Sequence, residues 1–486
     1  MMGRQNDYQH KLFITGFNLD KRIPEGHILR KISEKIDFDF IYGEVKDTYG
    51  SNGNVSVPPP VILKMMLLLI LYNVRSEREL IARLPLCLDW LWFLGYDLDD
   101  EIPNHSVLSK ARARWGVDAF RGFFERIVRK CVEEGLVDGH KMFVDASLID
   151  ADASRNSVID THSLKKYLNK GYRRLEESLD DLKDQKTTPA NERYISTTDP
   201  DASVTRHSKD RSKLRYKTHR AVDDNNEIIT ATKVTAGSVD DGNALMEMID
   251  LHQHNTKKKI DTVVADTKYG SVDNYLHCHD KEINAHIPAI EETHRDTGRR
   301  KDIFSKDRFI YNPDTDTFTC PAGETLTKQK FKKNRRHYEY RASSKSCGQC
   351  HMRNECTRSK SSRTLKRHAR QDELDVIIRK TTSRESKRDL KTRQHLSERS
   401  FARSTRYGFK RARWRRLWRM EIQDFLIAAI QNITVLISRT RNRMSKSNVE
   451  ECLKIGFQSL KRLSDRVHGW AVSLSMDFLL PNFSKS

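Results

Sequence analysis

Two short apolar runs, each closed by an aspartate, restrict the fold of this chain more than any other feature. The first reads KMFVD and ends at Asp145, and the second reads TVVAD and ends at Asp266. Runs rich in β-branched residues and followed by small polar residues predict buried strands. A carboxylate at the end of such a strand must be solvated, paired or bound to a cation, because an isolated buried charge is costly. For Asp266 a simpler interpretation is that it caps the next helix.

Further strands are predicted around these two. They lie in KTHRAVDD, EIITATKVTAGS and NAHIPAI, with a helix in ALMEMIDLHQ. This order describes a mixed α/β sheet, in which ligand sites gather at strand ends. Two strand-end carboxylates in one sheet can converge on Mg²⁺ or Mn²⁺, which prefer oxygen ligands. A helix packed on the sheet can supply a third carboxylate: Glu398 in HLSERSFARS is the candidate and Glu421 in WRMEIQ the rival. Singly, each acid fits a surface or capping role equally well.

Residues from about 20 to 135 are predicted to be mostly helical. PPP at 58–60 suits the first turn of a long apolar helix, and Ser76 and Ser106 are predicted N-caps. The helix after Ser106 carries Lys110, Arg112 and Arg114. A short helix, a turn and a basic helix fit a helix-turn-helix reader of DNA, but they fit a small helical bundle as well.

The length and charge of the chain limit its class. At 486 residues two or three domains are expected, and a net charge of +21 indicates an acidic polymer as partner, nucleic acid before a membrane surface. No signal peptide opens the chain, and the apolar runs from Val61 and Asp424 are each shorter than a membrane span and interrupted by polar residues. Eight cysteines are too few for a disulfide scaffold of this size. We therefore expect a cytoplasmic protein with reduced thiols and no membrane contact.

The sequence pattern divides the chain into five parts. They are a helical N-terminal domain, expected to bind DNA (1–135), the first part of an α/β core, expected to be catalytic (136–291), with a polar helix-rich insert, a basic cysteine-rich insertion (292–380), the last part of the core with the third acid (381–440), and a basic tail that we do not assign (441–486).

Four cysteines fall in one polar insertion. Their C-x₂-C-x₅-C core with one upstream partner suits a tetrahedral structural Zn²⁺, although four unconnected reduced thiols would read the same way. His351 is a substitute ligand. The four are Cys320, Cys347, Cys350 and Cys356, while Cys87, Cys131, Cys278 and Cys452 are scattered and predicted to be buried small hydrophobes.

A very basic run, RARWRRLWRM, follows the helix that carries Glu398. Arginines can hold phosphates while tryptophans stack on bases or pack on the core. The alternative is an amphipathic helix that turns its basic face to solvent. The residues concerned are Arg411, Arg413, Arg415, Arg416 and Arg419, interleaved with Trp414 and Trp418.

These motifs, in this order, resemble those of bacterial insertion-sequence transposases of the DDE type. The resemblance runs from about Arg22 to Ile437 and rests on PPPVILKMMLLLILYNVRSERELIARL, WFLGYDLDDEIPNHSVLSKARARWG, VDASLIDADASRNS, YKTHRAVDDNNEIITATKVTAGSVDDG, VVADTKYGSVDNY and ERSFARSTRYGFKRARWRRLWRMEIQ. It implies an RNase H-like catalytic domain after a helical N-terminal domain. It also implies that Asp145, Asp266 and Glu398 form an acidic triad that holds Mg²⁺ or Mn²⁺, with two ions expected.

The resemblance further implies that DNA is the partner and that a homodimer forms in the DNA complex. Family members often have a DNA-contacting lysine about seven residues after the glutamate, where this chain has Thr405 with Arg403 and Arg406 beside it. Lys268 and Tyr269 are expected to face DNA. The leading hypothesis is an enzyme that cleaves the ends of its element and joins them to target DNA. The alternatives are a decayed or domesticated DNA-binding protein and an RNase H-like nuclease without strand joining.

Overall fold

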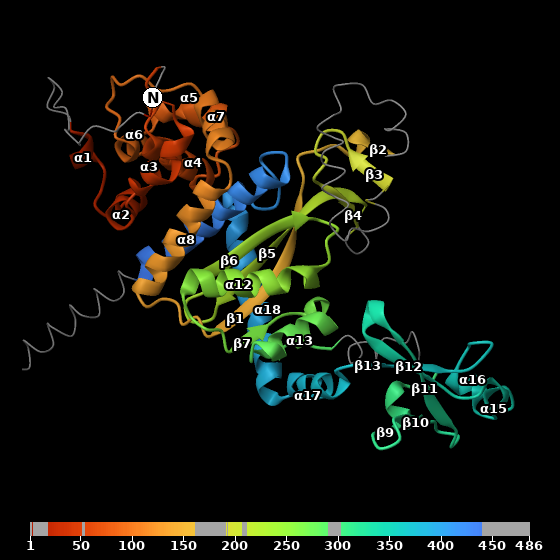
Figure 1. Ribbon diagram of the computed structural model, residues 1–486. Helices are drawn as coiled ribbons and strands as arrows, with labels where there is room; N and C mark the ends of the chain where they lie inside the picture. Colours follow the sequence, from red (N-terminus) through yellow and green to blue (C-terminus); the bar gives the residue numbers. More distant parts are fainter. Residues whose placement is uncertain are drawn as a thin grey trace, which may run out of the picture.

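The computed structural model describes residues 18–50, 54–160, 193–206, 211–289 and 303–439, together with Met2 and Asn191. The predicted polar helical insert and the tail 441–486 lie outside this part of the chain. Figure 1 shows three bodies: a group of N-terminal helices, a central mixed sheet, and a smaller sheet set to one side, beyond α13 and α17.

The central sheet has the strand order β6-β5-β1-β7-β8, with short β4 pairing the beginning of β5. The β1–β5 and β5–β6 pairs are antiparallel, whereas β1–β7 and β7–β8 are parallel. This arrangement is the mixed α/β sheet that the sequence predicted, with the RNase H-like strand order that the resemblance implied. The strands are β1 (Lys141–Asp150), β4 (Ser203–Thr205), β5 (Lys213–Asp223), β6 (Ile229–Ala236), β7 (Thr262–Val264) and β8 (Asn284–His286). Strands β2 (Val158–Asp160) and β3 (Tyr194–Ser196) form a separate pair.

Helices cover both faces of this sheet. Alternation along β1 sends Met142 and Val144 into a core with α12 (Leu245–Thr256) and α13 (Val272–Asp280), the two helices in front of the sheet in Figure 1. Phe143 therefore points to the opposite face, where it packs with Val264 of β7 and Leu396 of α18 (Arg384–Ser404). Every second residue of β1 and β7, counted from Phe143 and Val264, therefore points to the face that α18 covers.

The N-terminal helices form where the sequence predicts them. Helix α4 has proline in its first turn, as expected, and the hydroxyl of Ser76 accepts a hydrogen bond from the Glu79 N–H at 3.2 Å. The helix predicted from Ser106 begins there, but its N-cap residue is His105. The helices are α1 (Leu19–Arg22), α2 (Ile28–Lys35), α3 (Phe40–Val45), α4 (Pro59–Leu71), α5 (Glu77–Arg83), α6 (Leu88–Leu94), α7 (Ser106–Trp115) and α8 (Asp118–Glu133).

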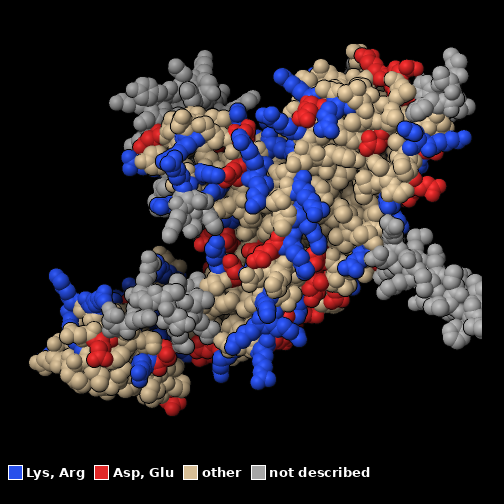
Figure 2. Space-filling model, turned by 180° about the vertical axis from the view of Figure 1, so that it is seen from behind, with Lys and Arg blue, Asp and Glu red and all other residues tan. Residues whose placement is uncertain are grey.

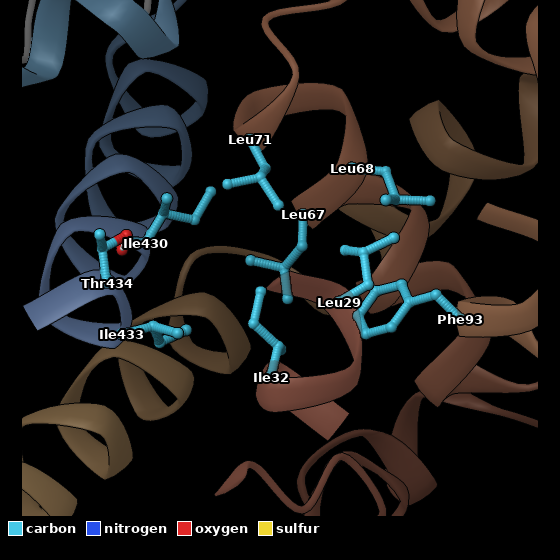
Figure 3. A pocket seen from close by; sticks show the side chains of 9 residues that line it. All are labelled: Leu29, Ile32, Leu67, Leu68, Leu71, Phe93, Ile430, Ile433 and Thr434. Atoms are coloured by element: carbon cyan, nitrogen blue, oxygen red, sulfur yellow. Dashed lines mark hydrogen bonds between the residues drawn. The ribbon is translucent and has the colours of Figure 1, made fainter. Parts of the chain in front are cut away.

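The N-terminal helices share their core with the last described helix, Leu417–Arg439. Figure 3 shows Ile430, Ile433 and Thr434 of that helix facing leucines of α4 and apolar side chains of α2 and α6 across a small apolar cavity. By length and composition Leu417–Arg439 could cross a membrane, but 78% of its most apolar window is buried inside the protein, so it serves as a core helix. The helical region is therefore packed against the catalytic core and has no hydrophobic core of its own.

The small sheet has the order β13-β12-β11-β10-β9. Although the insertion is polar and basic in sequence, Phe309, Phe318, Leu326, Tyr340 and Leu365 form a compact core. Two short helices, α15 and α16, belong to this insertion, and α17 leads back to the main sheet, where Leu374 and Ile377 join its core. The elements are β9 (Ile310–Asn312), β10 (Thr317–Thr319), β11 (Thr325–Lys332), β12 (His337–Arg341), β13 (Thr364–His368), α15 (Ser344–Gly348), α16 (Arg353–Cys356) and α17 (Gln371–Thr381).

Candidate active site

Asp145 and Asp266 lie at the same level of two neighbouring parallel strands. The register pairs Phe143 of β1 with Val264 of β7, and each aspartate follows two residues later. Because strand side chains alternate, both carboxylates belong to the α18 face of the sheet. The prediction that Asp145 ends its strand was wrong: β1 continues to Asp150, since β5 pairs with it along its whole length.

Asp145 is held by two side chains from α18. Its Oδ2 lies 3.0 Å from the Arg393 guanidinium, and the Ser397 hydroxyl also hydrogen-bonds the carboxylate. Arg393 and Ser397 are four residues apart, so they share one face of the helix. Burial raises the pKa of Asp145, and nearby Asp266 raises it further, while Arg393 opposes both. Two carboxylates that repel each other in a half-buried place are a typical setting for a cation.

Asp266 caps a short turn, as the simpler interpretation of the sequence held. Its Oδ1 accepts the N–H of Lys268 at 3.0 Å at the start of η6 (Thr267–Tyr269). The cap uses only Oδ1 of Asp266. Within the described residues no hydrogen bond reaches Oδ2, so this oxygen can bind a cation. The cap and a cation-binding role are therefore compatible for Asp266.

The two residues after this cap have different environments. The Lys268 side chain is 72% exposed, with its Nζ 3.4 Å from Oδ2 of Asp241, so it can face a ligand. Tyr269 is fully buried, and its hydroxyl lies 3.2 Å from Nδ1 of His219. The expectation that Tyr269 faces DNA was wrong, because the η6 turn directs the ring into the core beneath α12.

The two candidate glutamates lie in different places. Glu398 is exposed on α18, one residue after Ser397, and accepts a hydrogen bond from Gln394 Nε2 at 3.2 Å. Consecutive helical residues are about 100° apart around the axis, so Glu398 does not point directly at Asp145. Glu421 is surrounded by Arg121, Lys233, Glu247 and Asp424, and burial raises its pKa to about 7. Its neighbours do not include either aspartate of the site.

Oxygen ligands from Asp145 and Asp266 fit a divalent cation chemically. Within the described ranges, however, no three His, Cys, Asp or Glu side chains are arranged as a ready-made metal site. Ligation through Oδ2 of Asp145 would require its ion pair with Arg393 to open. The geometry thus provides a carboxylate pair and a third acid on the adjacent helix.

Buried polar contacts attach α18 to the sheet at both ends, ion pairs at the first and a hydrogen bond at the second. Asp389 accepts from Lys141 at 2.9 Å and lies 2.8 Å from His286, joining β1 and β8 to the first half of the helix. At the other end Arg220 of β5, opposite Asp145 in the ladder, bonds to Ser404 of α18 and to Asp424 of the last helix. A helix held at both ends keeps Arg393 and Ser397 in fixed positions over the carboxylates.

Sequence reasoning missed three residues of this region. Arg393 lies one helical turn before Ser397 and Glu398. This spacing alone does not distinguish it from the other arginines of α18, so no signal in the sequence marks it. Asp241 and His219 lie on the opposite face of the sheet and connect to Tyr269 and Lys268. Asp241 stands in the SVDDG motif, yet no spacing rule linked it with Asp266.

The arginines predicted to bind DNA are mostly engaged within the protein. Segment 411–416 is irregular, and Arg411 forms a bridge to Asp150 at the end of β1. Arg413 donates to Val74 and Asn73 of the helical region. The remaining contacts are Arg411 and Arg415 to Asp152, Arg416 to Asp201, Arg403 to Glu227, Arg419 over Trp418, and Arg112 over Trp414, while Arg406 is exposed.

The four cysteines of the insertion are near one another. Cys320, Cys347 and Cys356 pack against the same small core. Burial raises the pKa of the Cys356 thiol, with smaller effects from Cys320, Cys347 and Cys350. Since no closed metal geometry is present among the described residues, the zinc site stays a prediction.

Two regions of the chain match family models of transposases. Residues 17–114 match a transposase domain (DUF772), and residues 319–437 match a transposase DDE domain. The resemblance to DDE-type transposases is confirmed. The transposase DDE domain includes Glu398 and the arginine run, and its match indicates an enzyme that processes DNA. A comparison with curated proteins gives no match. Among solved structures, a piggyBac transposase synaptic complex with hairpin DNA is similar, with a TM-score of 0.35 and 9% identity over 86% of this chain and 75% of the other, too distant to support an argument.

Proposed function

We propose that this protein is a metal-dependent DNA transposase that binds the ends of its element, cleaves them and joins the 3′-hydroxyl ends to target DNA. The observation that carries the proposal is the register of β1 and β7, with Asp145 and Asp266 level on the face beneath α18. DDE-type enzymes generally use divalent cations. A bound cation would activate the attacking water or hydroxyl and stabilise the leaving oxygen.

The residues of the chain would share the remaining work. Asp145 and Asp266 would hold Mg²⁺ or Mn²⁺, and Glu398 would complete the ligand set. Ser397 and Arg393 keep Asp145 oriented before the cation binds. Lys268, exposed beside Asp266, and Arg406, exposed after α18, would contact phosphates. Water would be the nucleophile for cleavage and a 3′-hydroxyl for joining, with no covalent link between protein and DNA.

The face that carries α18 is suited to DNA. Figure 2 shows Lys and Arg side chains following one another down the middle of the molecule as seen from behind the sheet, with acidic side chains between them. Such a stripe attracts the phosphate backbone by a sequence-independent electrostatic term. Because two element ends must be brought together, we expect a homodimer in the DNA complex. We also propose that the protein acts in the cytoplasm.

Cleavage of DNA that carries the flanking ends of the gene would test this function. Wild type is compared, in Mg²⁺ or Mn²⁺, with Asp145→Asn, Asp266→Asn and Glu398→Gln, and with Glu421→Gln as the matched control. We expect metal-dependent nicking that the first three variants lose while DNA binding persists. Binding without cleavage by wild type would favour a decayed DNA-binding protein, and cleavage without joining would favour a nuclease.

A structural zinc ion in the insertion is part of the same proposal. Four neighbouring thiols in a small domain are the donor set that Zn²⁺ prefers, and zinc would stabilise the sheet that presents them. Elemental analysis of the purified chain should find one zinc per molecule, reduced in Cys347→Ser and Cys350→Ser. Protein without zinc that melts at the same temperature would contradict this.

A further inference from the structure

The hairpin formed by β11 and β12 carries a dense run of exposed cations. Residues 325–341, TLTKQKFKKNRRHYEYR, contain seven Lys or Arg residues and one Glu. Beyond Leu326 every residue of β11 is exposed, so the strand has no core beneath either face. The hairpin extends beyond the pairing of β11 with β10 and, with β13 beside β12 as far as His337, forms an arm of the small sheet. We call its outer cations the hairpin tip: Lys330, Lys332, Lys333, Arg335 and Arg336.

Among the described residues, the cations of the tip form no ion pair. Lys328, at the base of the hairpin, pairs with Asp316 at 2.7 Å, and Arg341 pairs with Glu339 at 3.1 Å. Within the described residues, no carboxylate lies within ion-pairing distance of the five residues of the tip. Five like charges on one short loop repel one another, and a polyanion relieves that repulsion when it binds.

An aromatic pair stiffens the arm just below the tip. Phe331 and Tyr338 face each other across the two strands, with ring centroids 4.8 Å apart. The Lys328 ammonium lies 3.8 Å over the Tyr338 ring from the base of the hairpin. Cross-strand aromatic pairs stabilise hairpins, so the tip is ordered before any ligand arrives. Little conformational entropy is then lost on binding.

The backbone of the tip is bonded to the segment that leads from the small sheet to α17 and α13. The carbonyl of Arg336 accepts the N–H of Ala369 at 2.9 Å, next to His368. Burial lowers the pKa of His368, and Arg336 and Asp273 act on it in opposite directions, so both lie near this imidazole. Asp273 is in the first turn of α13, seven residues after Asp266. Arg370, two residues after His368, donates to Asp280 at the other end of α13 at 2.9 Å, so the tip lies near the helix that covers the face opposite to α18.

We propose that the tip of the β11–β12 hairpin is a DNA-binding surface that holds the phosphate backbone of a duplex at a place separate from the carboxylate pair. Two-stranded β-ribbons fit the grooves of duplex DNA. Three of the five cations are lysines, which bind phosphate as point charges and read no base pattern. The contribution is therefore independent of sequence, as contact with varied target DNA requires. This inference rests on the proposed function.

Binding of the full chain to a duplex of arbitrary sequence tests the surface. The variant is Lys330→Gln/Lys332→Gln/Lys333→Gln. The matched control, Lys257→Gln/Lys258→Gln/Lys259→Gln, removes three exposed lysines from the edge where β7 begins, opposite to Asp266. Fluorescence anisotropy over a range of KCl concentrations gives the slope of log affinity against log salt. We expect this slope to fall by about 2–3 in the tip variant and by less than about 1 in the control.

Each outcome decides the matter. Equal slopes for wild type and tip variant would overturn the inference and leave the proposed function intact, since cleavage is assayed separately. Equal falls in both triple variants would mean that net charge alone matters, which also overturns it. A wild type that binds anionic vesicles but no duplex would overturn both proposals. Because the three lysines are exposed, the variants should fold, and Lys333→Gln alone should lower the slope by about 1.

Discussion

Segments 411–416 and 330–336 hold four and five cations, but the two segments lie in opposite kinds of surroundings. The first is flanked by acids and carbonyls of distant parts of the chain, with Asp152 between Arg411 and Arg415. The second forms the tip of an arm, where no carboxylate is close among the described residues. Sequence alone drew attention to the first, because tryptophans interrupt it and it follows Glu398.

The difference shows that charge density in a sequence does not determine which charges remain available. A segment within the core of a domain meets acids supplied by other strands and loops, and its arginines then stabilise the fold. The tip of the hairpin is bonded to the rest of the protein through the Arg336 carbonyl, while its cationic side chains are exposed. Topology therefore decides which of two similar basic runs can bind a polyanion, and the two can be separated by measuring stability and DNA affinity for each.

The largest effect is expected for Arg413. Its guanidinium donates to the Val74 carbonyl and to Asn73, and Gly408 leaves room for this contact, since a Cβ there would meet Asn73 Oδ1 at 2.6 Å. Arg413→Ala would leave these acceptors unpaired and lower the free energy of unfolding by about 2–4 kcal/mol. Urea denaturation measures it. Arg413→Lys keeps the charge but not the two-pronged geometry. If that variant is as stable as wild type, the interior assignment of the segment is wrong.

Much of the fold could be predicted from local pattern. Strands β1, β5, β6 and β7 and helix α18 follow from apolar runs, alternation and caps, because each of these signals is local. The extension of β1 to Asp150 could not be predicted, since it depends on pairing with β5. The core of the small sheet was missed because its apolar residues are widely spaced between polar ones.

Prediction of the site was less complete. The two aspartates were found because each follows an apolar run, and their common level depends only on a two-residue offset from the paired positions. The ion pair of Arg393 with Asp145 and the inward turn of Tyr269 depend on packing between distant elements. Such contacts leave no periodic signal, and resemblance rather than spacing selected Glu398 over Glu421.

The next effect concerns Glu421, which lies in the helix that the arginine run introduces. Burial raises its pKa to about 7, against the partial compensation of Arg121 and Lys233, with Glu247 and Asp424 adding to the rise. A carboxyl whose pKa is higher in the folded state contributes stability at pH below about 4.5, and this contribution is lost as the pH rises through about 7. The melting temperature should therefore fall between these pH values, by the equivalent of at most about 3 kcal/mol.

Glu421→Gln removes that titration. The variant should melt at nearly the same temperature as wild type at low pH and at a higher temperature at pH above about 7. Calorimetry at several pH values checks the prediction, with Glu282→Gln at an exposed acid as control. Identical pH profiles for wild type and Glu421→Gln would mean that the carboxylate is well solvated, and the helix would then be less buried than the arginine contacts imply.

The smallest effect is expected on duplex affinity, from a change at Asp152. Asp152 neutralises Arg411 and Arg415, whose side chains are 72% and 50% exposed, so Asp152→Asn should release two cations toward solvent. Exposed ion pairs are weak, about 0.2–1 kcal/mol, so duplex affinity should rise only about two- to fivefold. Glu282→Gln makes the same change in net charge far from the run, beside Lys259. A rise confined to Asp152→Asn would mean that Arg411 and Arg415 bind DNA once Asp152 no longer pairs with them. An equal rise in both variants would leave the hairpin tip as the segment whose charges act on DNA.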